Sequence, residues 1–244
     1  MKGFLLAAGF LLLCMPFSSA AQAFEKDLIQ TSKGPLEITF IGHGSLMFGY
    51  EGKIIHVDPY SELADYGTLP KAHLILLTHE HRDHLDLKAL QAVRTPSTEI
   101  VLTEICARQV EGGIVMKNGD RKTVQGLEIE AVPAYNLVHM RSEGQPFHPR
   151  GAGNGYVITF GDKKVYVAGD TEDIPEMKAL KGIHVAFLPM NLPYTMTPEM
   201  TANAARSFRP AILYPYHFGN TDTSRILELL KGEKDIEVRI RNMK

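Results

Sequence analysis

The sequence has no tryptophan and only two cysteines, Cys14 and Cys106, among its 244 residues. Cys14 lies in an N-terminal segment that we expect to be removed, so no intramolecular disulfide can form in the remaining chain. Stability must then come from a hydrophobic core, and about 220 residues are enough to build one. No partner motif accompanies Cys106, so we interpret it as a small buried side chain and not as a nucleophile.

The sequence also lacks an excess of basic residues. It contains 26 Lys and Arg against 28 Asp and Glu, which gives a formal net charge of −2. A large positive field that could hold nucleic acid non-specifically is therefore missing. We accordingly predict no nucleic-acid partner.

No apolar run in the N-terminal region is long enough to cross a membrane. The run over residues 4–13 has about half of the ~20 residues that a bilayer requires. It follows Lys2 and precedes the small-residue ending AQA at 21–23, which is the pattern of a secretory signal peptide. We therefore expect residues 1–23 to be a cleaved signal peptide, and the protein to be periplasmic or extracellular with no stable membrane span after cleavage. An uncleaved anchor is the alternative.

The chain does contain a regular succession of short segments rich in β-branched and aromatic residues, which predict strands. We expect them at 36–42, 45–50, 53–59, 73–78 and 99–103 and, after a Gly/Pro-rich break at 146–155, in YVITFG, KVYVAGD, HVAFLPM and AILYPYH. Helical patterns lie between strands at 86–94, 104–111, 175–181, 198–208 and 222–231. This alternation in both halves predicts a mixed-sheet α/β domain. No linker interrupts it, so we expect residues 24–244 to form one domain.

The stretch THEHRDH, residues 78–84, concentrates three imidazoles and two carboxylates directly after the apolar run LILL. Side chains at the end of a strand point into the crevice at the sheet edge. His79 and His81, two apart in extended backbone, project to the same side and can bind one ion. Asp83 and His84 lie on the following turn and can serve a second ion. A solvated, charged loop is the alternative interpretation.

The pattern His-x-His-x-Asp-His after a hydrophobic strand resembles the metallo-β-lactamase superfamily. The segments FIGHGSLMFGYEGKIIHVDPY, VYVAGDTEDIPEM and LYPYHFG resemble, more closely, the branch that contains the ascorbate-phosphate lactonases and the N-acylphosphatidylethanolamine phospholipase D-like proteins. The resemblance covers about residues 36–231. It implies an α/β (α+β) fold, a four-layer αββα sandwich in which two mixed β-sheets are flanked by helices.

The resemblance also implies the remainder of the metal site. Asp170, in a Gly-Asp-Thr segment after a strand, is expected to bridge two metal ions, and His217 is expected to ligate the second of them. Asp58 is expected to support the metal loop through hydrogen bonds. His43 is expected near the cleft, as a supporting or substrate-contacting group.

One departure from the family pattern concerns the third ligand of the first metal. Many relatives in this branch carry a histidine two residues after a strand-ending alanine, whereas VPAYN places Asn136 there. Asparagine is a poor zinc ligand. We favour His148 for the role, because some uncharacterised members of the branch pair an Ala-Tyr-Asn segment with a later Phe-His-Pro; His139 and the absence of a third histidine are the alternatives. On this hypothesis, His148→Ala loses metal from the first site and Asn136→Ala largely keeps it.

Two adjacent divalent ions lower the pKa of a bridging water and supply hydroxide at neutral pH. We therefore predict an exported metal-dependent hydrolase that cleaves an ester, lactone or phosphodiester bond of a small molecule or lipid, with Asp83, Asp170 and His43 as catalytic residues. Zinc suits the His-rich ligand set, and manganese is the alternative. The competing hypotheses are a secreted β-lactamase-type amide hydrolase and a non-catalytic exported metal-binding protein.

Three other features receive a structural interpretation. GAGNGY, residues 151–156, is interpreted as a flexible cleft loop, because it neither follows a strand nor opens a helix as a phosphate-binding loop would. His56, within a strand-like run, is expected to be a core or surface imidazole. The neighbouring Glu172 and Asp173 are interpreted as solvated loop charge.

Overall fold

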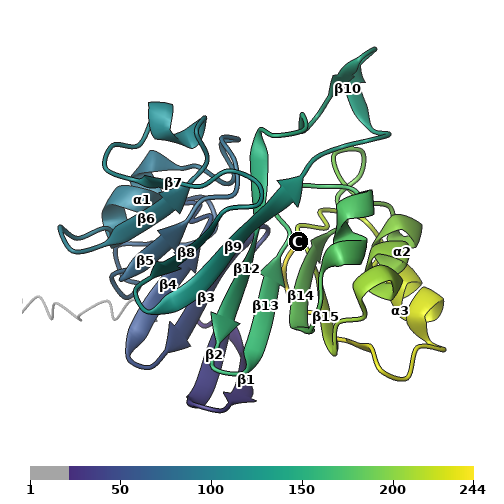
Figure 1. Ribbon diagram of the computed structural model, residues 1–244, viewed down its shortest axis with the longest axis horizontal. Coiled ribbons are helices and arrows are strands. Elements are labelled where there is room, and N and C mark those ends of the chain that lie inside the picture. Colours follow the sequence, from purple (N-terminus) through teal and green to yellow (C-terminus); the bar gives the residue numbers. More distant parts are fainter. Residues whose placement is uncertain (1–21) are drawn as a thin grey trace, which may run out of the picture.

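The computed structural model describes residues 22–244, and Figure 1 shows how its strands and helices are arranged. Nearly all of the predicted signal peptide therefore lies outside the described residues. Within them, no helix combines the length and the apolar character needed to cross a bilayer.

Two seven-stranded sheets form the centre of the molecule (Figure 1). The first contains, in spatial order, β1 (Glu25–Thr31), β2 (Gly34–Gly42), β3 (Ser45–Tyr50), β4 (Lys53–Val57), β5 (Leu74–Leu76), β6 (Glu99–Leu102) and β7 (Ile114–Val115). The second contains β16 (Glu237–Val238), β15 (Ile212–Tyr216), β14 (Ile183–Pro189), β13 (Lys163–Val167), β12 (Gly153–Phe160), β9 (Leu127–Ala134) and β8 (Arg121–Val124). Neighbouring strands are parallel from β4 to β7 and from β13 to β16, and antiparallel elsewhere. The prediction of two mixed sheets is confirmed.

The sheets bury a shared core between them, in which aromatic rings from both sides interdigitate. The ring of Phe187 in β14 lies 6.2 Å from that of Phe40 in β2 and 6.1 Å from that of Phe48 in β3, measured between centroids. All three side chains are fully or almost fully buried. Burial of each such ring contributes about 1.5–3 kcal/mol, so this layer fixes how the two sheets face each other.

Helices cover the outer faces of the sheets. The first sheet carries α1 (Leu87–Val93), capped by Asp86, whose carboxylate accepts from the backbone N–H groups of Lys88 and Ala89. The second carries α2 (Pro198–Phe208), capped by Thr197, and α3 (Ser224–Leu230) (Figure 1). Cys106 lies buried in the apolar cluster beneath α1, where burial raises the pKa of its thiol to about 11. Its burial and raised pKa agree with the interpretation of Cys106 as a buried structural side chain and not a nucleophile.

Two of the five predicted helices are single turns of 3-10 helix. They are η1 (Cys106–Arg108), expected as a helix over 104–111, and η2 (Pro175–Ala179), expected over 175–181. Short helices are costly to nucleate, and here Gly112 and Gly113 follow the first turn while extended backbone at Leu180 ends the second. The sequence pattern thus located both helical segments correctly, but each segment is too short to continue as an α-helix.

Further segments differ from the prediction, among them β1, β7 and β16, which were not expected as strands. The hairpin of β10 (Met140–Ser142) and β11 (Gln145–Pro146) was not expected, and it stands away from both sheets (Figure 1). The interpretation of GAGNGY as a flexible loop was wrong, because its last four residues begin β12 and are buried. A Cβ atom on Gly155 would lie 2.8 Å from the carbonyl oxygen of Ala168. Glycine is therefore needed here for close backbone approach and not for flexibility.

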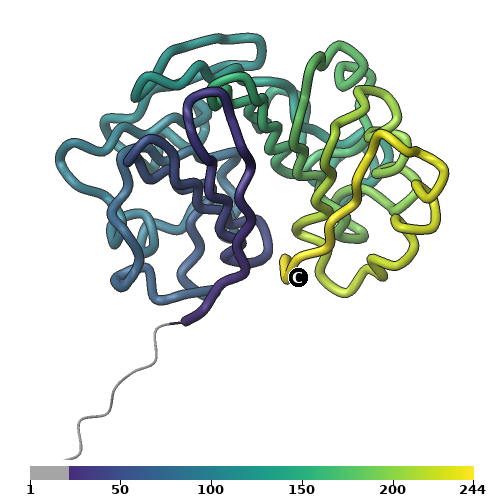
Figure 2. Tube along the Cα trace, turned by 90° about the horizontal axis from the view of Figure 1, so that it is seen from below, coloured from purple at the N-terminus to yellow at the C-terminus, as the bar shows by residue number. Residues whose placement is uncertain are grey.

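The two ends of the described chain lie side by side, as Figure 2 shows. The guanidinium of Arg241 donates to both carboxylate oxygens of Asp27 in β1, at 2.8 and 2.7 Å. The backbone N–H of Asn242 donates to Glu25 at 2.6 Å. Burial raises the pKa of Asp27, but hydrogen bonds from Arg241 and Tyr214 outweigh it and lower the pKa. These contacts tie the outer strand of the first sheet to the second half of the chain.

His56, in β4, is a core imidazole, and it predicts a pH-dependent stability. It is fully buried, its Nε2 donates to the carbonyl oxygen of Pro70 at 3.0 Å, and burial lowers its pKa from 6.5 to about 4. Between these values the unfolded chain binds a proton that the folded chain does not, so stability falls as the pH falls from 6.5 toward 4, by up to about 3 kcal/mol. Urea unfolding of metal-free protein at pH 7.5 and 5 should show this loss. It should be smaller in His56→Phe, because other imidazoles with pKa values lowered by burial remain, and an equal loss in both proteins would refute the assignment.

Candidate metal site

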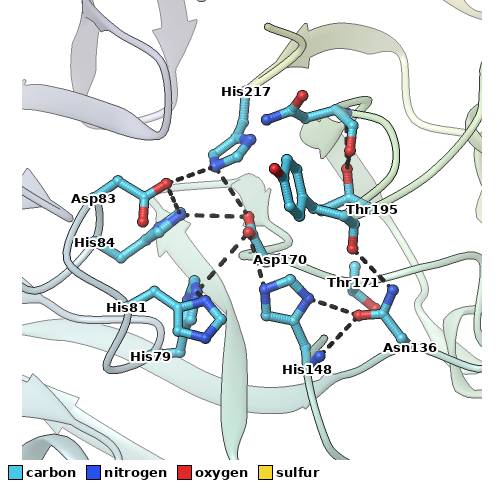
Figure 3. Close-up of polar contacts among 12 residues, drawn as sticks. His79, His81, Asp83, His84, Asn136, His148, Asp170, Thr171, Thr195 and His217 are labelled. Carbon is cyan, nitrogen blue, oxygen red and sulfur yellow. Dashed lines mark hydrogen bonds and ion pairs between the residues drawn. The ribbon is translucent and has the colours of Figure 1, made fainter. Parts of the chain in front are cut away.

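The predicted site residues lie where strands of both sheets end. His79 follows β5 in the first sheet, while Asp170 and His217 follow β13 and β15 in the second. In the second sheet β13 and β15 each run parallel to β14, so their carboxyl ends lie at one edge of that sheet. The residues after β5 reach the same place from the first sheet, since His79 Nε2 lies 3.9 Å from Asp170 Oδ2. Figure 3 shows the resulting cluster, with the carboxylate of Asp170 at its centre.

One group of possible ligands consists of His79, His81, His148 and Asp170. One nitrogen or oxygen atom from each lies within 4.8 Å of those of the others. His79 Nε2 lies 3.1 Å from His81 Nδ1, and His148 Nε2 lies 3.2 Å from Asp170 Oδ2. Burial, together with the neighbouring His84, lowers the pKa of His79 and keeps its lone pair available. Three imidazoles and a carboxylate are a donor set that a divalent metal takes.

A second group lies on the other side of Asp170. Nε2 of His84 and Nε2 of His217 lie 3.4 and 3.6 Å from Asp170 Oδ1. The carboxylate oxygen Oδ2 of Asp83 lies 3.3 Å from His217 Nε2 and 3.7 Å from His84 Nε2. Asp170 therefore turns one carboxylate oxygen to each group (Figure 3).

Unpaired polar atoms in the cluster fit bound cations. His84 Nε2 and Asp170 Oδ1 are buried and have no hydrogen-bond partner among the described residues. Leaving such atoms unpaired is costly. Burial lowers the pKa of His84, but Asp170 and Asp58 outweigh this effect and raise it to about 10, so negative charge favours a cation at this position. The residues present thus suit the metal ions that the sequence predicts.

Asp58 supports the metal loop as expected. Its Oδ1 accepts from the backbone N–H of Thr78 at 2.8 Å, and its Oδ2 accepts from the Thr78 hydroxyl at 2.6 Å and from His84 Nδ1 at 2.8 Å. Because Nδ1 of His84 is held in this way, its Nε2 points to the ligand group. Asp58 itself has φ = 44°, a left-handed conformation that non-glycine residues adopt only when the surroundings enforce it.

His43 contacts the second group and does not belong to the first. Its Nε2 lies 3.1 Å from Asp83 Oδ2, and its ring lies 3.8 Å from that of His217 between centroids. Its carbonyl oxygen accepts from the backbone N–H of His217 at 3.0 Å. The next residue must be small, since a Cβ atom on Gly44 would lie 2.8 Å from the His84 ring. Glycine at position 44 therefore lets the turn before β3 pass close to the ring of His84.

The structure brings His148, and not His139, to the first group. Asn136, at the position where many relatives are expected to carry a histidine, lies behind His148: its Oδ1 accepts from His148 Nδ1 at 2.6 Å and from the His148 backbone N–H at 3.1 Å. The ring of His139 turns away, with Nδ1 at 2.7 Å from Glu172 Oε1. Asn136 is thus not placed as a metal ligand itself. Its hydrogen bond orients the ring of His148, which is placed as one.

The interpretation of Glu172 as solvated loop charge was wrong. Its side chain is fully buried and accepts backbone N–H bonds from Leu137, Val138 and His139, all at 2.7 Å, and the Asn136 side-chain amide at 3.0 Å. These bonds outweigh the effect of burial and lower the pKa of Glu172. Sequence reasoning missed this role because the four donors come from a segment more than thirty residues away. Asp173, beside it, is partly exposed.

Two mixed sheets with a His/Asp cluster at their shared strand ends define a metal-dependent hydrolase of the metallo-β-lactamase fold. The family model described as Beta-lactamase superfamily domain matches residues 37–217, and the chain belongs to this family. The resemblance inferred from its motifs is thereby confirmed at the level of the superfamily.

Three similar proteins support this assignment. A UPF0173 metal-dependent hydrolase of Methanopyrus kandleri is 30% identical over 195 residues, which cover 75% of this chain and 84% of that protein. The crystal structure of a proposed metal-dependent hydrolase from Parabacteroides distasonis is 53% identical with a TM-score of 0.87, over 91% of this chain and all of that one. Igni18, a metallo hydrolase of Ignicoccus hospitalis, is 25% identical with a TM-score of 0.69, over 84% and 94% of the two chains. None of these names states a substrate.

Proposed function

We propose that this metal-dependent hydrolase is exported, holds two divalent metal ions, and cleaves an ester, lactone or phosphodiester bond of a small molecule or lipid. The observation that carries the proposal is Asp170, whose two oxygens face two separate groups of imidazoles. The proposal of export is supported by the signal-like pattern of residues 1–23. Zinc is the preferred ion for this His-rich set, and manganese is the alternative.

The chemistry of the site depends on which residues hold the ions and which move protons. His79, His81 and His148 would hold one ion, and Asp83, His84 and His217 the other, with Asp170 shared. Divalent ions bound there would lower the pKa of a coordinated water and polarise the carbonyl or phosphoryl oxygen of the substrate.

Asp83 and His43 are placed to handle the proton that the attacking water loses. The carboxylate of Asp83 is about one-third exposed, and its Oδ2 lies within hydrogen-bond distance of His43 Nε2. Asp83 would accept the proton at Oδ2, and His43 would carry it toward the cleft and the leaving group. A protein that only stores metal has no need of such a pair.

Metal removal tests the proposal. Metal analysis should find two ions per chain, and a chelator should abolish hydrolysis of the active members of a panel of lactones, esters, phosphodiesters, phospholipids and β-lactams. Zinc or manganese should restore the activity. His184→Gln, which removes an imidazole outside the site, should behave as the wild type.

Three outcomes would count against parts of the proposal. Fewer than two ions per chain would exclude the dinuclear site, and turnover of β-lactams alone would favour the amide hydrolase. Metal binding without any turnover would favour a non-catalytic protein. Export is tested separately, by locating the full chain and a variant lacking residues 1–23 in cell fractions.

A further inference from the structure

A cleft of about 640 Å³ opens beside the metal cluster. The acidic and basic residues that line it lie in different parts of the cleft. The acidic residues in it, Asp83 and Asp170, face the imidazoles of the cluster. The two charged groups that lie outside the cluster are the guanidiniums of Arg82 and Arg141. Beyond the metal ligands, the cleft therefore presents positive charge.

Arg141 differs from the other arginines near the cleft in having no acidic partner. Arg82 donates to Glu62 at 2.9 Å, and Arg150, outside the cleft, donates to Glu176 at 2.7 Å. Among residues 22–244, no carboxylate lies within 4.0 Å of the Arg141 guanidinium. Its donors are thus free for a ligand, and a guanidinium matches carboxylate and phosphate oxygens in pairs.

The side chain of Arg141, which lines the cleft, contacts the aromatic ring of Phe147. Its guanidinium carbon lies 5.8 Å from the centroid of the Phe147 ring, within the range of a cation–π contact. Phe147 in turn packs edge-on against Tyr194 at 5.0 Å between centroids. Both rings line the same cleft, and Phe147 directly precedes His148. The cleft therefore presents two aromatic rings together with the metal cluster and the cation.

We propose that Arg141 binds an anionic group of the substrate, a carboxylate or a phosphate, away from the bond that is cleaved. The apolar part of the substrate lies along Phe147 and Tyr194. The inference rests on the proposed function, since it names the class of substrate for that site: small esters or lactones that carry a separate negative charge. Arg141 is a specificity-determining residue in this assignment.

The test measures binding, so that it does not depend on turnover. Calorimetric titration of the metal-loaded protein compares dicarboxylates of four to six carbons with monocarboxylates of the same length. One carboxylate occupies the metal end and the second is available to Arg141. The best dicarboxylate should bind the wild type about tenfold more tightly than its monocarboxylate counterpart, as expected for one charge-assisted pair. Analogues with a terminal phosphonate decide whether the cation prefers carboxylate or phosphate.

Two variants separate local recognition from a general effect of charge. In Arg141→Gln the two affinities should converge, and Arg141→Lys should keep part of the difference. Arg150→Gln removes the same charge from the same segment outside the cleft and should retain the wild-type preference. Equal affinities in the wild type, or an unchanged preference in Arg141→Gln, would overturn the inference. Because metal content and hydrolysis are measured on the same samples, failure of the proposed function would be recognised separately.

Discussion

Asp170→Asn is expected to lower the affinity of the protein for both metal ions, each by at least about a hundredfold, and to abolish hydrolysis. Loss of a partner that only orients a ligand costs 10–100-fold, and Asp170 is placed as a ligand itself. Its Oδ1 faces His84 and His217, while its Oδ2 faces His148. An amide offers one neutral oxygen where the carboxylate offers two charged ones. A single substitution should therefore affect both ions together.

The measurement is metal stoichiometry after dialysis against buffered free zinc, together with hydrolysis of the substrate found in the panel. Asp173→Asn makes the same chemical change three residues further on, at a partly exposed side chain, and should keep both ions. If Asp170→Asn retained one ion at wild-type affinity, Asp170 would belong to a single site and the shared position would be wrong.

The sequence predicted most of the long strands and the three α-helices, but it missed β1 and predicted full helices where the structure has 3-10 turns. The strand at 45–50 was placed at its observed bounds, because a short apolar run between glycines is a local signal. η1 and η2 were expected as helices, since the side-chain pattern of one turn does not reveal whether the turn propagates. The β10–β11 hairpin has exposed residues on both strands and so left no periodic pattern to find.

In the site, too, residues grouped by a local motif could be predicted, and residues that depend on distant contacts could not. His79, His81, Asp83 and His84 come from one motif, whose spacing alone brings them together. Glu172 could not be found in this way, because its meaning depends on three backbone N–H groups that only the folded chain brings to it. A buried carboxylate and a solvated one have the same sequence signature when the donors are backbone groups.

The last prediction concerns Asn136, for which the contacts in the structure lead us to a different expectation from the one drawn from the sequence. Asn136→Ala was expected to keep metal at the first site, because Asn136 is not itself a ligand. Its Oδ1, however, lies 2.6 Å from Nδ1 of His148 and fixes the ring with Nε2 toward Asp170. Its side-chain nitrogen donates to Glu172 at 3.0 Å and to the carbonyl oxygen of Tyr194 at 2.9 Å. We therefore expect Asn136→Ala to weaken the first site by about 10–100-fold.

The comparison with His148→Ala and Glu172→Gln decides how this effect arises. His148→Ala removes a ligand and should cost more than Asn136→Ala, whereas Glu172→Gln should cost less, because Asn136 still accepts from His148. The measurement is the affinity of each site for cobalt, followed by its absorption spectrum, with Asn203→Ala as a control at an exposed asparagine of α2. The unfolding free energy of the metal-free variants separates two causes of weaker binding. It stays unchanged if only the orientation of the His148 ring is lost, and it falls if the fold is destabilised. Wild-type cobalt affinity at both sites in Asn136→Ala would show that His148 is held without Asn136, by the packing of its own segment.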